Sequence, residues 1–531
     1  MSSKPPRRDS LPRDRATAST LTRRDVLTLL GGAAVAGALP ACSREPEPKA
    51  AAQAPEPPAP RPLPDDLHYR SLREVAALIE ARDISPVEVT QYMLDRIAAL
   101  DGRLRSYATV TPERALAAAR RAEQEIADGR YLGPLHGMPI AVKDLCFTAG
   151  NRTMGGMAAY RDFVPDFDAT VVHRLEAAGA VLLGKLNLTE GAMAGYHPDF
   201  DIPVNPWGEQ LWSGASSSGS GVATAAGLCF GSLGSDTGGS IRFPSMANGI
   251  VGLKPTYGRV SRYGVLPLAE TMDHVGPMTR RTADAAMMLQ VMAGYDGNDP
   301  TSLGDSVPDL LADLDTGIGG LRIGYDAAYS ESGTDAGLAA AVEAVLEALQ
   351  GLGADLVEVR MPAETAQLGD AWFALCAYEA YQAHAAMLNS KADAFGPFFS
   401  DFLAVGASIT AEQHAGASQL RAAFSQQFQA ALASVDAMVC PAGGLTFPVE
   451  HSTLYGGREA IEPLFAAVQM QFTIPADFAG TPTLTLPCGF SEDGRPYAFQ
   501  FMGQRLSEPV LCRLGHAYEG LTDWHQRHPP V

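Results

Sequence analysis

The sequence predicts an α/β fold in which helices cover a β-sheet, because segments with helical and strand-like spacing alternate along the chain. Residues 169–179 have the apolar spacing of a helix, and residues 180–184 follow as a short apolar run that is typical of a buried strand. The pattern recurs later, where residues 338–349 predict a helix between strand candidates at residues 321–324 and 355–359. Such alternation indicates a sheet packed against helices.

Three helix starts and one strand precede this alternation. Ser71 and Ser85 each stand three residues before a glutamate, which is the pattern of a capping box, and a proline takes the first helical position after Ser85. Thr111, followed by Pro and Glu, predicts the start of a third helix. Residues 137–143 then form an apolar, strand-like run, so we expect Lys143 at the end of a strand.

The chain divides by composition into residues 1–41, 42–64 and 65–531. The first part carries seven Lys or Arg and three Asp, a net charge of +4, whereas the whole chain has a net charge of −20. This contrast indicates a targeting segment rather than part of the fold. The second part is rich in Pro and Ala and predicts an extended tether. The third part contains no further linker of that composition, so we expect a single large domain.

The targeting segment resembles a twin-arginine export signal with a lipobox. Residues 22–27, Thr-Arg-Arg-Asp-Val-Leu, carry the paired arginines, and the apolar region that follows is short for a membrane span. Residues 39–42, Leu-Pro-Ala-Cys, resemble a lipobox, in which Cys42 would become the lipid-anchored N-terminus. An ordinary cleavage site with an incidental Cys42 is the alternative. We therefore expect an exported protein, either periplasmic or anchored to the membrane as a lipoprotein.

Two Gly/Ser clusters lie between residues 212 and 264. Residues 214–221 are too rich in residues that tolerate unusual backbone angles to predict an ordinary helix or strand interior. Residues 236–240, Asp-Thr-Gly-Gly-Ser, form the second cluster. A glycine turn can present several backbone N–H groups to one point, as a phosphate cradle or as an oxyanion hole beside a serine nucleophile. Neither cluster fits the phosphate-binding motifs, and a flexible linker is the remaining alternative.

Lys143 favours the catalytic interpretation, because a neutral amine can take a proton from a serine. A lysine at the end of a strand is more often a solvated charge. Its pKa would have to fall from about 10.4 to near 7, which costs about 4.6 kcal/mol. Burial can supply a change of that size. A buried Lys143 beside the serine clusters could therefore act as a base.

These residues resemble the amidase signature family, together with residues 252–260, Gly-Leu-Lys-Pro-Thr-Tyr-Gly-Arg-Val, and residues 273–278, Asp-His-Val-Gly-Pro-Met. The resemblance runs from about residue 70 to the C-terminus. It implies a large mixed, twisted β-sheet covered by α-helices on both faces. It also implies a Ser-cisSer-Lys triad, with Ser240 as the nucleophile, Ser216 in a cis peptide bond and Lys143 as the base. The implied oxyanion hole consists of the backbone N–H groups of Thr237, Gly238, Gly239 and Ser240.

The activity implied by the resemblance is hydrolysis of a carboxamide C–N bond to a carboxylate and ammonia or an amine, through an acyl-enzyme on Ser240. The expected partner is a small-molecule or peptide amide, with no cofactor and no metal. An ester-preferring hydrolase with the same triad is one alternative, which the ratio of amide to ester turnover would reveal. A catalytically idle, tethered amide-binding protein is another; its mark would be loss of a triad residue, and all three are present.

Other features narrow the expectations. The chain has 60 Asp and Glu against 40 Lys and Arg, which argues against nucleic-acid binding. The seven cysteines show no metal-binding spacing, and the substrate-binding residues stay unassigned. A homodimer is compatible with the resemblance. No G-x-S-x-G motif surrounds the serines, which argues against an α/β-hydrolase.

Four further residues and one segment have expected roles. Asp236 and Arg242 are expected to pair and hold the nucleophile loop, and His274 is expected to be structural. Asp477 stands where the family usually has asparagine, a change expected to affect the substrate entrance or a local turn. In the family, the segment corresponding to residues 365–402, which is rich in aromatics here, helps to shape the substrate funnel; a helical core face is the alternative.

Overall fold

The computed structural model describes residues 63–531, which contain one mixed β-sheet of eleven strands. The expected export signal, Cys42 and all but the last residues of the tether lie outside this range. The strands are β1 (Tyr107–Val110), β2 (Pro139–Lys143), β3 (Val181–Leu186), β4 (Gly231–Asp236), β5 (Val251–Lys254), β6 (His274–Thr279), β7 (Arg322–Tyr325), β8 (Asp355–Glu358), β9 (Ala437–Pro441), β10 (Thr483–Phe490) and β11 (Pro496–Gly503). Their order across the sheet is β1-β3-β2-β4-β6-β5-β10-β11-β9-β7-β8.

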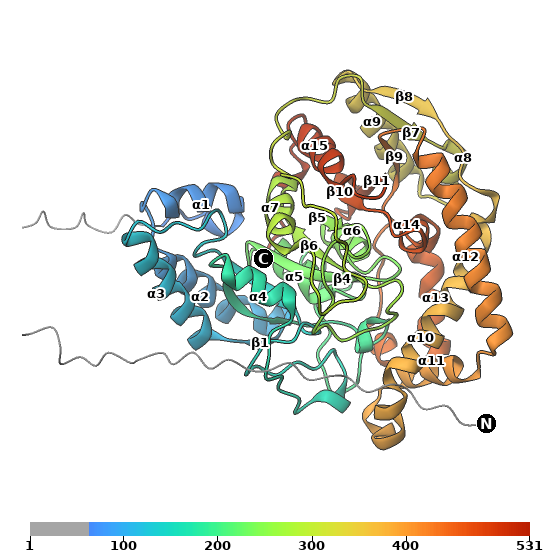
Figure 1. The fold of residues 1–531 in the computed structure, drawn as a ribbon, viewed down its shortest axis with the longest axis horizontal. Coiled ribbons are helices and arrows are strands. Elements are labelled where there is room, and N and C mark those ends of the chain that lie inside the picture. Colours follow the sequence, from blue (N-terminus) through green and yellow to red (C-terminus); the bar gives the residue numbers. More distant parts are fainter. Residues whose placement is uncertain (1–62) are drawn as a thin grey trace, which may run out of the picture. The chain divides into compact units, whose positions relative to one another are not determined.

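The α-helices lie around this sheet (Figure 1). They are α1 (Leu72–Glu80), α2 (Pro86–Leu104), α3 (Pro112–Ala127), α4 (Thr170–Ala177), α5 (Ser218–Ala225), α6 (Arg242–Asn248), α7 (Thr282–Met292), α8 (Ala327–Glu331), α9 (Ala336–Gly351), α10 (Leu368–Ser390), α11 (Pro397–Ser408), α12 (Ala411–Leu432), α13 (Arg458–Val468), α14 (Ile474–Ala479) and α15 (Glu508–Glu519). None of those in residues 63–531 combines the length and apolar composition needed to cross a bilayer.

The helix starts and the α/β alternation expected from the sequence are confirmed. Ser71 and Ser85 both form complete capping boxes, at the starts of α1 and α2. The predicted pairs of helix and strand correspond to α4 with β3 and to α9 with β7 and β8. Strand pairs β2–β3, β2–β4, β7–β8 and β7–β9 are parallel and the others are antiparallel, so the sheet is mixed.

Helices cover both faces of the sheet. Gly252 of β5 faces α6, because a Cβ atom on it would lie 2.3 Å from Oγ of Ser245. The next residue, Leu253, pairs with Leu484 of β10. The Leu484 side chain faces α15, because a Cβ atom on Gly515 would lie 2.5 Å from its Cδ2 atom. Successive strand residues point to opposite faces, so α6 and α15 lie on opposite sides of the sheet.

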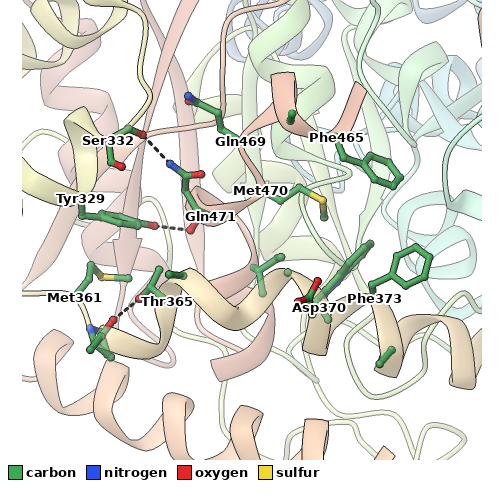
Figure 2. Close-up of a pocket in the computed structure, with 18 of the residues that line it drawn as sticks. Tyr329, Ser332, Met361, Thr365, Asp370, Phe373, Phe465, Gln469, Met470 and Gln471 are labelled. Atoms are coloured by element: carbon green, nitrogen blue, oxygen red, sulfur yellow. Dashed lines mark hydrogen bonds between the residues drawn. The ribbon is translucent and has the colours of Figure 1, made fainter. Parts of the chain in front are cut away.

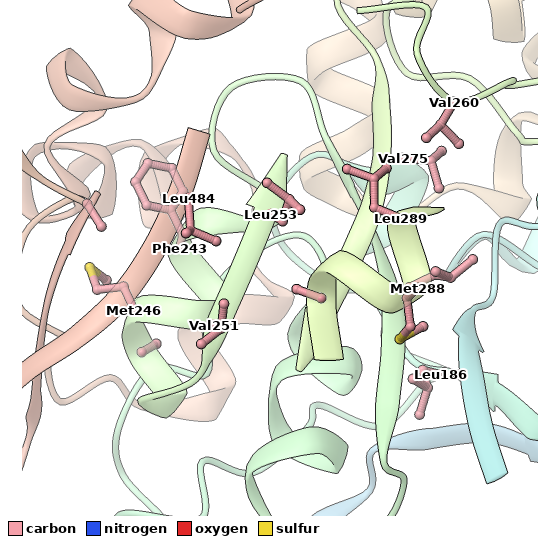
Figure 3. Close-up of a cluster of buried hydrophobic side chains, with 14 of the residues drawn as sticks. Leu186, Phe243, Met246, Val251, Leu253, Val260, Val275, Met288, Leu289 and Leu484 are labelled. Atoms are coloured by element: carbon pink, nitrogen blue, oxygen red, sulfur yellow. The ribbon is translucent and has the colours of Figure 1, made fainter. Parts of the chain in front are cut away.

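The main hydrophobic core fills the space between these helices and the central strands. Figure 3 shows part of it, with Leu253 of β5, Val275 of β6, Leu289 of α7 and Leu484 of β10. Each of these side chains is at most 1% exposed. The core therefore fixes the central strands, and β4 among them carries the second Gly/Ser cluster at its carboxyl end.

The first Gly/Ser cluster departs from the expectation, because its second half is helical and forms the start of α5. Glycine in a helix costs about 1 kcal/mol relative to alanine. A side chain would not fit, however: a Cβ atom on Gly219 would lie 2.4 Å from the Ser106 carbonyl oxygen, and one on Gly221 would lie 2.6 Å from Nδ2 of Asn248. Close packing, rather than turn formation, explains these two glycines.

Candidate active site

Lys143 ends β2 with its side chain fully buried among three serines. Its Nζ atom lies 2.6 Å from Oγ of Ser216, 2.9 Å from Oγ of Ser217 and 2.8 Å from Oγ of Ser235. Burial lowers the pKa of Lys143 from its ordinary value of 10.5 to about 7. The amine is therefore partly neutral near pH 7.

Two neighbouring parallel strands bring these groups together. Lys143 ends β2, and Ser235 is the last residue but one of β4, which pairs with β2 through Val142 and Leu233. Ser216 and Ser217 immediately precede α5, and the peptide bond between Ala215 and Ser216 is cis, as the family resemblance implies. Parallel strands present their carboxyl ends at the same edge of a sheet, which is where the lysine and the serines meet.

Hydrogen bonding determines how the three hydroxyls can share the amine. Oγ of Ser217 accepts the backbone N–H of Ser235 and donates to the backbone carbonyl of Ser235, both at 3.2 Å. It must therefore accept, not donate, toward Nζ of Lys143. A neutral amine has two N–H groups and one lone pair. If Ser217 and Ser235 take the two N–H groups, the lone pair is left facing Ser216, whose proton it can accept.

Ser240 lies in the turn between β4 and α6 and is partly exposed, unlike the buried Ser216. The backbone N–H of Ser217 donates to the backbone carbonyl of Ser240 at 3.4 Å. Within residues 63–531, no hydrogen bond joins the hydroxyls of Ser216 and Ser240. The structure thus places Lys143 directly against Ser216 and connects Ser240 to the pair through the backbone.

The backbone donors of the turn are divided between two uses. The N–H of Gly239 donates to Oδ1 of Asp236 at 2.7 Å, so the expectation that it serves an oxyanion hole needs correction. The N–H groups of Thr237, Gly238 and Ser240 donate to no other residue in the described part of the chain. Three unused donors in one turn can stabilise a developing negative charge.

A buried charge cluster lies behind this turn. Arg242 bridges two carboxylates, with Nη2 2.9 Å from Oδ1 of Asp236 and 2.6 Å from Oδ2 of Asp477. Burial alone would raise the pKa of Asp236, but the Arg242 guanidinium holds it well below its usual range. Burial raises the pKa of Asp477 well above its usual value, against the effect of Arg242. Asp477 is fully buried on α14, so it is not at the substrate entrance.

His274 belongs to the same cluster. Its Nδ1 atom lies 3.2 Å from the Asp236 carbonyl oxygen, and burial lowers its pKa well below the ordinary value. The neighbouring Asp273 accepts a hydrogen bond of 2.6 Å from Oγ1 of Thr237. Both residues therefore hold the turn from behind, and neither contacts Ser240.

Two chambers meet beside Ser240. The inner chamber, about 60 Å³, is lined by Ser240, Thr237 and apolar side chains that include Met193, Phe243 and Leu464. The outer chamber, about 990 Å³, is lined by residues that include Tyr329, Thr365, Asp370, Phe373 and Gln471 and is shown in Figure 2. Trp372, Phe465 and Met470 line both chambers.

The aromatic segment 365–402 serves both of the roles weighed for it. Trp372 and Phe373 line the chambers, and the indole N–H of Trp372 donates to the Thr237 carbonyl oxygen at 2.9 Å. Phe399 and Phe402 are fully buried in the hydrophobic core. The first turns of α10 therefore contribute to the site, whereas α11 contributes mainly to the core.

Comparison with known proteins identifies the family. Residues 88–512 match the family described as Amidase. The chain belongs to the amidase signature family. The amidase-family protein AmiD of Mycobacterium tuberculosis is 44% identical over 468 residues, which cover 88% of this chain and 97% of that protein. The glutamyl-tRNA(Gln) amidotransferase of Chloroflexus aurantiacus contains a polypeptide that is 37% identical, and the match covers 87% of this chain and 99% of that polypeptide.

A solved structure supports the same assignment. The peptide amidase of Stenotrophomonas maltophilia superposes with a TM-score of 0.76 at 33% identity, covering 87% of this chain and 98% of its own. The fold expected from the resemblance is thereby confirmed, and this protein is an amidase that hydrolyses amide C–N bonds.

Sequence reasoning about this amidase missed Ser235. The signal was present, because Ser235 stands next to Asp236 at the end of a strand that leads into the glycine turn. Recognising it required knowing that β4 pairs with β2, which no local pattern shows.

Proposed function

We propose that this amidase works through an acyl-enzyme on Ser240, with Lys143 as the base and Ser216 as the proton relay. One observation carries the proposal: a buried amine with a pKa of about 7 lies 2.6 Å from the Ser216 hydroxyl. A base is most effective when its pKa lies near the working pH.

The proposed steps follow from the positions of these groups. Ser216 gives its proton to Nζ of Lys143 and takes the proton of Ser240, while Oγ of Ser240 attacks the amide carbonyl carbon. The unused N–H groups of Thr237, Gly238 and Ser240 support a role in stabilising the oxyanion. The same relay, run in reverse, protonates the leaving amine as the C–N bond breaks. Water then attacks the acyl carbon by the same route and releases the acid.

The first test measures ammonia or amine release by residues 65–531 from aliphatic, aryl and peptide carboxamides. Ser240→Ala should lower turnover by about 10³-fold or more, because it removes the nucleophile. Lys143→Met should remove most turnover while the far-ultraviolet circular dichroism spectrum stays native. Near-wild-type rates in Lys143→Met across the pH range would reject Lys143 as the base. Matched ester substrates report whether the enzyme prefers amides or esters.

Trapping the intermediate tests the nucleophile independently. Rapid acid quenching during turnover, followed by peptide mass spectrometry, should find the acyl group on the peptide that contains Ser240. An acyl group on Ser216 or Ser217 instead would assign the nucleophile to another hydroxyl.

We also propose that the amidase is exported by the twin-arginine route and anchored by a lipid on Cys42, with residues 42–64 as a tether. The paired arginines and the Leu-Pro-Ala-Cys sequence support this proposal. An exported enzyme would not meet tRNA, so we do not assign the role of the amidotransferase relative. Cys42→Ser should release the full chain from the membrane fraction, and unchanged fractionation would reject the anchor. Light scattering of residues 65–531 tests for a homodimer.

A further inference from the structure

We propose that this amidase takes amides with a short, uncharged acyl group of about two to four carbon atoms, counting the carbonyl, while the amine portion extends into the outer chamber. The inference rests on the proposed function, because it assumes that Ser240 is the nucleophile. It assigns the two chambers to the two halves of the substrate.

The inner chamber offers almost no polar group to a ligand. Oγ1 of Thr189 donates to the Met193 carbonyl, the Tyr196 hydroxyl donates to Ser218, and Oγ1 of Thr237 donates to Asp273. The Trp372 indole is also engaged, and no residue lining the chamber carries a charged side chain. Among the polar side chains that line it, only the Ser240 hydroxyl and the Trp212 indole N–H lack a partner in residues 63–531. A charged acyl group would lose its hydration there without compensation.

The volume of the inner chamber limits the length of the acyl group. It measures about 60 Å³, whereas an apolar cavity that admits benzene, with six carbons, measures roughly 150 Å³. In proportion, the chamber holds about two or three carbon atoms, and slight adjustment of flexible side chains extends this to about four. Acetyl, propionyl and butyryl groups meet this limit, whereas a fatty acyl chain does not.

The reaction sequence decides which half of the substrate lies in which chamber. After the C–N bond breaks, the amine must leave and water must reach the acyl carbon, while the acyl group stays bound to Ser240. The outer chamber, about 990 Å³, provides space for the amine and for water, and it meets the inner one at Trp372, Phe465 and Met470. The amine therefore lies on the outer side and the acyl group on the inner side.

The outer chamber also carries a negative charge that no cation compensates. Asp326 is paired with Arg360, and Glu462 is paired with Arg458. Asp370, at the start of α10, is exposed and forms no hydrogen bond or ion pair with another residue in the described part of the chain. Amines with a positive charge should therefore be accepted more readily than amines with a negative charge.

The test is a series of N-acyl 4-nitroanilides with acetyl, butyryl, hexanoyl and decanoyl groups, assayed by release of 4-nitroaniline from residues 65–531. We expect kcat/KM for the acetyl or butyryl compound to exceed that for the decanoyl compound at least tenfold. Leu464→Ala, which enlarges the inner chamber, should move the preferred acyl group to a longer chain. The same truncation at the exposed Leu356, outside both chambers, is the matched control and should leave the preference unchanged.

A second comparison tests the charge of the outer chamber. Acetanilides that carry a quaternary ammonium or a carboxylate in the para position should differ in kcat/KM at least twofold, in favour of the cation. Asp370→Asn should remove that difference without changing the preferred acyl length.

The outcomes separate the inference from the proposed function. Ser240-dependent turnover that stays level or rises from acetyl to decanoyl would overturn the chamber assignment and leave the nucleophile assignment intact. Turnover that survives Ser240→Ala would overturn the proposed function itself. A folded protein that hydrolyses no member of the series, but releases ammonia from long-chain primary amides, would also overturn the assignment.

Discussion

At the scale of single residues, the site depends on how Ser217 and Ser235 orient the Lys143 amine. The protonated amine can donate to three hydroxyls, whereas the neutral amine must keep its lone pair toward Ser216. We predict that kcat/KM rises with pH through an apparent pKa of about 7, because Lys143 must lose its proton to act as the base. Activity is therefore lost as the pH falls through this value.

Ser235→Ala tests the orientation. Removing this acceptor destabilises the ammonium form more than the neutral form, so the acid limb of the pH profile should move to lower pH. The maximal kcat should fall about tenfold, because a hydrogen bond to a charged group contributes about 1.5–3 kcal/mol. Ser232→Ala on the same strand is the control, because Oγ of Ser232 bonds to Thr224 and not to Lys143. An unchanged acid limb in Ser235→Ala would contradict the argument.

At the scale of elements, one ion-pair cluster joins α14 to the turn that carries the nucleophile. Asp477 of α14 and Asp236 of β4 both bind Arg242, the first residue of α6. Since burial raises the pKa of Asp477, a neutral side chain that can still accept a hydrogen bond should replace it well.

The prediction contrasts two substitutions of Asp477. Asp477→Asn should keep kcat within about threefold of the wild type. Asp477→Leu should lower the free energy of unfolding by about 3 kcal/mol, because it leaves a buried guanidinium N–H without an acceptor. Urea unfolding and kcat measurements check both variants. Equal destabilisation by Asn and Leu would show that the charge of Asp477, rather than its hydrogen bond, holds the cluster.

At the scale of the whole molecule, the six cysteines of the described residues are all buried and free. Burial raises the pKa of each thiol above the ordinary value of 9.0, to about 12 for Cys146 and Cys440. The unfolded chain releases these protons near pH 9, while the folded chain retains them. The free energy of unfolding should therefore fall as the pH rises from about 9 to about 11, by up to about 1.4 kcal/mol per pH unit for each thiol.

Buried lysines oppose this effect. Burial lowers the pKa values of Lys143, Lys185 and Lys254, and these residues make the folded state more stable as the pH rises toward 10.5. Six thiols outweigh three lysines, so the net change should be a loss of stability. Urea titrations of residues 65–531 with reductant at pH 8.5 and pH 10.5 measure it, and Cys512→Ala should reduce the loss. A free energy of unfolding that is constant over this interval would contradict the prediction.

Local sequence patterns predicted the elements well, and they predicted the use of individual donors less well. Capping boxes and apolar periods depend on neighbours in the chain, so the starts of α1 and α2 and the order of helices and strands followed from them. The capture of the Gly239 N–H by Asp236 depends on the folded turn. The contact of Asp477 with Arg242 joins residues 235 positions apart. No local pattern contains that information.

The two chambers have a consequence for how this lineage can diversify. The relay residues all lie between residues 143 and 240, whereas the side chains shared by the chambers, Trp372, Phe465 and Met470, come from a later part of the chain. Mutations in residues 361–470 can therefore alter substrate choice while the relay is inherited unchanged. A chimera that receives this segment from a relative should acquire the preference of the donor and retain the pH profile of the recipient.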